Sequence, residues 1–145
     1  MEFPIDPNDY YSLLAAVHRL GRDLEPALRF ELAGLLAPRA PSCLGRVADA
    51  ARGRKLHDGF ARDMLPMLIE ACSEAIDAGM ETRGDCYEAG YSDGGVDWEC
   101  REITVPNEIA TQLIPIRRTL RDIVALLDRV DDLMAAQQAI PDMRR

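Results

Sequence analysis

The adjacent pair His57-Asp58 comes nearest, among the side chains of this sequence, to a metal-binding motif. The only other histidine of the chain, His18, lies upstream of this pair. Neutral imidazole and carboxylate are suitable ligands for a divalent metal, and water bound to such a metal can act as a nucleophile. If the fold brings further ligands to this pair, it predicts a metal-dependent hydrolase.

The order of these residues resembles that of the HD superfamily of metal-dependent phosphohydrolases, which are all-helical. That family uses a histidine, an adjacent His-Asp pair and a distant aspartate, which match His18, His57-Asp58 and Asp122 here. The resemblance covers four residues, and the segment before the pair is polar, whereas the family's pair usually ends an apolar helix. The competing interpretation makes Asp58 the N-cap of the next helix and leaves His57 in an exposed linker.

Other catalytic signatures are missing from the sequence or stand alone. Asp128, Asp131 and Asp132 share a helix face and can hold Mg²⁺ through water, but a solvated acidic surface is the more ordinary interpretation. The sequence has no phosphate-binding glycine loop with lysine, no H-E-x-x-H and no G-x-S-x-G. We therefore expect a protein that is not an enzyme and uses no cofactor.

A second group of residues indicates binding rather than catalysis. Residues 81–102 hold seven acidic and two basic residues, a net charge of −5, with the only tryptophan and two of the four tyrosines. Aromatic side chains anchor protein interfaces, and charges steer the encounter with an oppositely charged partner. The expected binding residues are Glu88, Tyr91, Asp93, Asp97, Trp98 and Glu99.

The same segment has the pattern of a β-hairpin over about residues 86–103. Alternation is expected to place the aromatic and apolar residues of both strands on one face: Tyr87, Ala89, Tyr91, Val96, Trp98 and Cys100. This face either binds a partner or packs on the helices. Two registers fit, and a turn at 94–95 is favoured over one at 93–94, because the latter sets Glu88 opposite Glu99.

The four cysteines contain no C-x-x-C pair, so no zinc knuckle or thioredoxin-like motif is expected. In both hairpin registers Cys86 and Cys100 fall on opposite faces, which predicts that they form no disulfide. With Cys43 and Cys72, they are expected to be free thiols in a reducing compartment.

The rest of the chain has helical periodicity. Helices are expected over about 7–20, from 23 onward, over 43–51 and over 58–78. Asp6 or Asn8 is expected to cap the first helix and Gly21 to end it. Residues 64–69 are apolar on nearly all sides, which predicts a central, buried helix. Because Pro66 follows Asp63 by three residues, we expect the helix either to restart at Asp63 or to kink there.

The last helix, capped by Asn107, has a regular apolar seam. Its members recur at alternating steps of four and three residues: Ile109, Leu113, Ile116, Leu120, Ile123, Leu127, Val130 and Met134. Such a seam packs within a helical bundle or between copies of the chain, so a homo-oligomer through residues 109–134 is an alternative. Pro115 is expected to kink this helix or to mark its start.

The composition predicts one mainly α domain over residues 1–145, a four- to five-helix bundle with an inserted hairpin and flexible tails at 1–6 and 138–145. The 145 residues are 48% hydrophobic and carry a net charge of −8, which disfavours direct nucleic-acid binding. Residues 18–55, however, hold eight basic and four acidic residues. No membrane span or secretory signal is visible, so we expect a cytoplasmic protein, in its own cell or in a host.

These patterns favour a small, acidic, non-enzymatic protein that binds and blocks a partner with a basic surface. The inhibitor, immunity and anti-defence proteins of bacteria and phages are analogous in size and charge. The alternatives are the metal-dependent phosphohydrolase described above and a self-associating helical protein.

Overall fold

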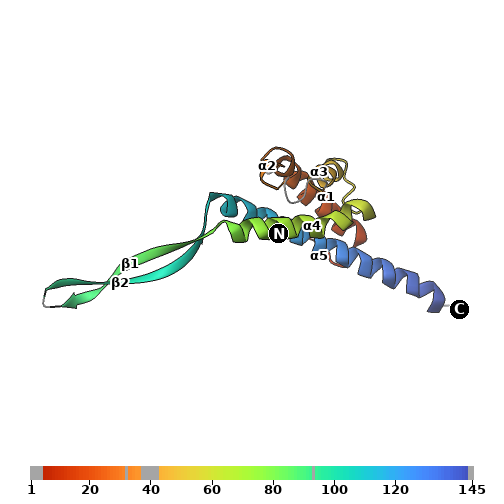
Figure 1. The fold of residues 1–145 in the computed structure, drawn as a ribbon. Coiled ribbons are helices and arrows are strands. Elements are labelled where there is room, and N and C mark those ends of the chain that lie inside the picture. The colour runs from red at the N-terminus through yellow and green to blue at the C-terminus, as the bar shows by residue number, and fades with distance from the viewer. Residues whose placement is uncertain (1–4, 32, 37–42, 93, 144–145) are drawn as a thin grey trace.

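The computed structural model describes residues 5–31, 33–36, 43–92 and 94–143. The elements follow the order α1 (Tyr10–Pro26), a π-helical turn η1 (Ala27–Glu31), α2 (Ala33–Leu36), α3 (Cys43–Arg52), α4 (Gly59–Ala78), β1 (Met80–Ser92), β2 (Gly95–Pro106) and α5 (Glu108–Met143). The helices form one body, and the two strands leave it as a long antiparallel ribbon, here called the arm (Figure 1). The predicted mainly helical fold with an inserted hairpin is therefore confirmed.

The core lies where α5 packs along α1 and α4, with α3 against α1 and α4. The middle of the α5 seam is buried there within the same chain, at Leu113, Leu120, Ile123, Leu127 and Val130. Ile109 and Met134, at the ends of the seam, are exposed. A second copy of the chain could therefore reach the buried part of the seam only if these helices separated.

The N-terminal helix differs from its prediction. Asp9, rather than Asp6 or Asn8, caps α1, because its carboxylate accepts the Tyr11 backbone N–H at 3.2 Å. The helix does not end at Gly21 but continues through it to Pro26. A Cβ at residue 21 would lie 2.3 Å from Cδ1 of buried Leu56. The glycine therefore serves close packing and not helix termination.

Helix α4 begins after Asp58, whose backbone carbonyl accepts the Arg62 N–H at 2.9 Å, as expected for an N-cap. It passes through Pro66 without restarting. The predicted burial on all sides is wrong: Leu65 and Leu68 are buried, but Met67 is 54% exposed. The apolar run is wider than the face that α4 presents to the core.

The connection from α3 to α4 is a Schellman turn with an unusual residue at its left-handed position. The Lys55 N–H bonds to the Ala50 carbonyl at 2.7 Å, and the Arg54 N–H bonds to the Ala51 carbonyl at 3.3 Å. Arg54 has a φ of 59°, where glycine is the usual residue and other residues cost about 1–2 kcal/mol. The neighbouring Gly53 does not occupy this position.

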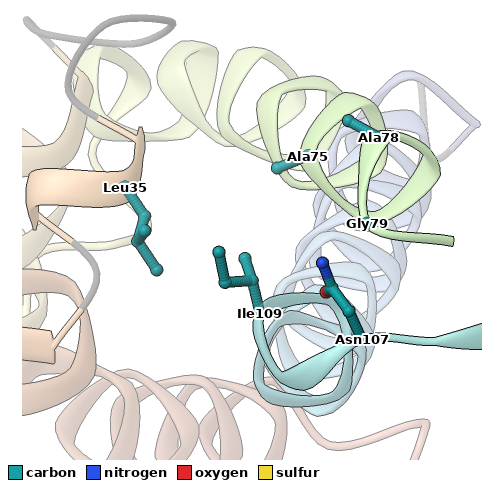
Figure 2. Close-up of a pocket in the computed structure, with 6 residues that line it drawn as sticks. All are labelled: Leu35, Ala75, Ala78, Gly79, Asn107 and Ile109. Atoms are coloured by element: carbon teal, nitrogen blue, oxygen red, sulfur yellow. The ribbon is translucent and has the colours of Figure 1, made fainter. Parts of the chain in front are cut away.

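The root of the arm is held by contacts between the ends of α4 and α5. The Asn107 N–H donates to the Gly79 carbonyl at 2.8 Å, and the Asn107 side chain caps α5 by accepting the Ala110 N–H at 2.9 Å. This confirms the predicted cap, and α5 begins well before Pro115. Figure 2 shows Asn107 beside Gly79, at a hollow of about 180 Å³ into which Leu35 and Ile109 point.

The predicted flexible tails lie partly outside the described residues, since residues 1–4 and 144–145 are not among them. Arg129 of α5 donates to the Pro7 carbonyl and to the Asn8 side chain, both at 2.7 Å, which ties the start of the described chain to α5. Among the described helices, none is long and apolar enough to cross a membrane.

Candidate functional site

The strands of the arm are longer than the predicted 86–103, and a bulge at Ala89 sets their register. Near the tip Ser92 lies opposite Gly95, so the favoured turn at 94–95 is wrong and the connection is at 93–94. Ala89 has no partner, because Glu88 lies opposite Trp98 and Gly90 opposite Asp97. Because β1 contains this one extra residue, all pairs between the bulge and the helical body are shifted by one position.

With this shift, a turn at 93–94 no longer places Glu88 opposite Glu99. Without the bulge Glu88 would lie opposite Glu99, but with it Tyr87 lies opposite Glu99 and Glu88 opposite Trp98. The repulsive pair is replaced by a hydrogen bond, since the Tyr87 hydroxyl donates to a Glu99 carboxylate oxygen at 2.8 Å. Glu99 in turn raises the pKa of the Tyr87 hydroxyl, because that bond favours the protonated phenol.

The shift also places Cys86 directly opposite Cys100, with their Cα atoms 4.1 Å apart, and the two form a disulfide. The prediction of four free thiols is therefore wrong for this pair, because both predicted registers assumed regular alternation in each strand. It is confirmed for Cys43 and Cys72, which are free and buried. Burial raises the pKa of the Cys72 thiol to about 11.

Because residues opposite each other share a face, the register divides the arm into two unlike faces. The apolar face carries Tyr91, Val96, Trp98 and the disulfide, with Glu88 beside Trp98. The polar face carries Asp85, Tyr87, Asp97, Glu99 and Arg101. The prediction that Tyr87 and Tyr91 share a face is wrong, since the bulge lies between them.

Several groups on the polar face are paired with one another. Arg101 bonds to Asp85 at 3.3 Å, and its guanidinium lies 5.9 Å from the centre of the Tyr87 ring. Ser92 donates to the Asp97 carboxylate at 2.9 Å. These contacts stabilise the ribbon from one side and leave the opposite side to its aromatic residues.

The apolar face is not covered by the helical body. Tyr91 is 81% exposed and Trp98 61% exposed. Along both described strands, partial burial is limited to Asp85, Gly90, Ile103 and Val105. Of the two uses expected for the hairpin aromatics, packing onto the helices is therefore wrong, because the arm points away from the body (Figure 1).

The six predicted binding residues are thus separated by the fold. Glu88, Tyr91 and Trp98 share the apolar face, whereas Asp97 and Glu99 lie on the polar face. Asp93 lies outside the described residues. The sequence located the segment, but it missed the bulge and the disulfide. With a turn at 93–94, Cys86 lies opposite Cys100 only if β1 contains one extra residue. A search for the register that pairs these two cysteines would therefore have indicated both the bulge and the disulfide.

The alternative metal site is brought together only in part. The rings of His18 and His57 lie 5.6 Å apart between centroids, but no three His, Cys, Asp or Glu side chains among the described residues are placed to hold a metal ion. Burial, His57 and Arg54, in that order, lower the pKa of His18. Nearby positive charge opposes a cation at this position.

Two members of the acidic cluster on α5, Asp128 and Asp131, form ion pairs with α4. Arg62 of α4 pairs with Asp128 at 2.9 Å and with Asp131 at 2.6 Å. These pairs raise the pKa of Arg62, chiefly through its hydrogen bond to Asp131. Two of the three aspartates on this helix face, for which a solvated surface was expected, therefore connect α5 to α4.

Comparison with protein-family models, curated proteins and solved structures finds no match to this chain.

Proposed function

We propose that this protein binds a partner protein through the apolar face of its arm and blocks the partner surface that it occupies. The observation that carries the proposal is the exposure of Trp98 and Tyr91 on a ribbon that the helices do not cover. Exposed aromatic side chains grouped on one face are typical of binding sites, whereas single exposed apolar residues are ordinary.

The apolar face is suited to serve as the centre of an interface. Tryptophan and tyrosine each bury about 150–250 Å² when fully covered, and they are enriched among residues whose truncation costs 2 kcal/mol or more in binding. Val96 and the disulfide lie on the same face and extend the apolar contact. The pairs across the polar face support the ribbon from behind.

The charge of the arm favours a basic partner. Residues 81–102 carry a net charge of −5, and Glu88 lies beside Trp98 on the apolar face. Asp97 and Glu99 lie on the other face, so they act through the field around the ribbon more than through direct contact. Steering of this kind raises the association rate and weakens with added salt.

The test compares a double variant of the arm with a matched control on the body. Trp98→Ala combined with Tyr91→Ala removes the two anchors, and Tyr11→Ala removes an aromatic side chain of α1 that is 78% exposed. Proteins captured by the wild type from the cells that produce it, or from their host, are identified, purified and titrated against all three forms.

We expect the double variant to bind the purified partner at least tenfold more weakly, with Tyr11→Ala unchanged. The proposal is wrong if the double variant and the wild type bind with equal affinity. If the captured protein is a second copy of the chain, the arm serves self-association in place of blocking another protein.

A further inference from the structure

A pocket on the helical body, away from the arm, is lined by positively charged side chains. It has a volume of about 190 Å³ and is formed by Ala15, His18, Arg19, Arg22 and Arg54. The first four come from α1, and Arg54 comes from the turn between α3 and α4. None of the described residues that line the pocket is acidic.

Arg54 is held at this pocket by a backbone conformation that favours glycine. Its φ of 59° places it at the left-handed position of the Schellman turn. Strained positions of this kind concentrate at functional sites, where the side chain is needed for something other than stability. Gly53 is adjacent, so a shift of one residue in the sequence would have supplied the usual glycine.

His18 is a second unusual feature of the pocket. Its Nε2 atom is buried and has no hydrogen-bond partner among the described residues. The ring packs against His57, and the surrounding groups that bear on its charge are His57 and Arg54. Such a group is rare in folded proteins and calls for a physical explanation.

Arg19 and Arg22 also line the pocket, and the three arginines together fit an oxyanion such as phosphate. Guanidinium groups bind phosphate through parallel N–H donors, and they remain charged at any physiological pH. Within the described part of the chain, neither Arg22 nor Arg54 forms an ion pair that would neutralise it. The surroundings that oppose a metal ion next to His18 therefore favour an anion.

We propose that this pocket binds a phosphoryl group, either as free phosphate or as a small phosphate monoester. Arg22 and Arg54 supply the main donors, and Arg19 lines the same pocket. The His18 ring responds to the added negative charge. The site is independent of the arm, so it can be present whether or not the arm binds a protein.

The test is titration of the purified protein with inorganic phosphate and with glycerol phosphate, followed by calorimetry and by the imidazole NMR signals of His18. A control titration with sodium chloride at the same ionic strength measures the effect of charge screening alone. Arg22→Ala and Arg54→Gly alter the pocket, and Arg52→Ala removes a neighbouring arginine that does not line it.

We expect saturable binding that shifts the His18 signals, at least tenfold weaker in Arg22→Ala and Arg54→Gly and unchanged in Arg52→Ala. Arg54→Gly should also raise the melting temperature, because it relieves the backbone strain while it removes the ligand contact. Tighter binding of the monoester identifies it as the ligand, and equal binding indicates recognition of the phosphoryl group alone. The proposal is overturned if neither compound binds beyond the chloride effect, or if Arg52→Ala weakens binding as much as Arg54→Gly.

Discussion

Breaking the bond between Cys86 and Cys100 should unfold the arm and leave the helical body folded. The arm is a two-stranded ribbon with most residues of both strands exposed, and such ribbons are marginally stable alone. The bond joins residues 14 apart in sequence. Closing a loop of this size stabilises a folded segment by about 3 kcal/mol, which corresponds to a change on the order of 10²-fold in its opening equilibrium.

Hydrogen–deuterium exchange can measure this change residue by residue. We would compare the oxidised protein, the reduced protein and a Cys86→Ser/Cys100→Ser double variant. Amides of β1 and β2 should exchange on the order of 10²-fold faster in the last two forms, whereas those of α1, α4 and α5 stay protected. The buried Cys72 thiol, with its pKa of about 11, should resist alkylation in all three forms and so report that the body is folded.

Two results would refute this reasoning. Arm exchange that rises less than about threefold would mean that side-chain pairs, such as Tyr87 with Glu99, hold the ribbon without the bond. Parallel loss of protection in the helices would mean that arm and body unfold as one cooperative unit.

Three further predictions concern the body. Gly79→Ala should lower the free energy of unfolding by about 1–3 kcal/mol in urea titration, because the added Cβ would lie 2.6 Å from the Asn107 Oδ1 that caps α5. Arg62→Ala should cost at most about 1 kcal/mol, and less at high salt, because its aspartate partners are largely exposed. Because the pKa of His18 is lowered in the folded protein, the unfolded chain binds a proton at His18 more readily than the folded chain does. The free energy of unfolding should therefore fall as the pH drops below about 6.5, and His18→Gln should lessen that fall between pH 7.5 and 5.5.

The helical elements were predictable from the sequence where periodicity and caps agree. The Asn107 cap, the start of α4 at Asp58 and the extent of α3 follow from such local signals. The end of α1 did not follow from local signals, because the role of Gly21 is ambiguous in the sequence. A glycine can end a helix or allow a close contact, and only the position of Leu56 decides between them.

The candidate site was located by composition but not resolved. Acidic and aromatic residues marked the hairpin correctly, yet their distribution between its faces depends on the unpaired Ala89. No local propensity distinguishes Ala89 as a bulge from its neighbours. The pocket around His18 was missed because Arg22 and Arg54 are far apart in sequence and meet only when the α3–α4 turn packs near α1.

The unpaired Ala89 has a consequence for how this protein can vary over generations. Deleting that one residue would leave a regular ladder, with Cys86 still opposite Cys100 and Tyr91 still opposite Val96, because Glu88 and Gly90 would then be consecutive opposite Trp98 and Asp97. Related sequences can therefore differ in length by one residue between Cys86 and Tyr91 and keep the same faces, so an alignment of distant relatives should allow a gap at this position.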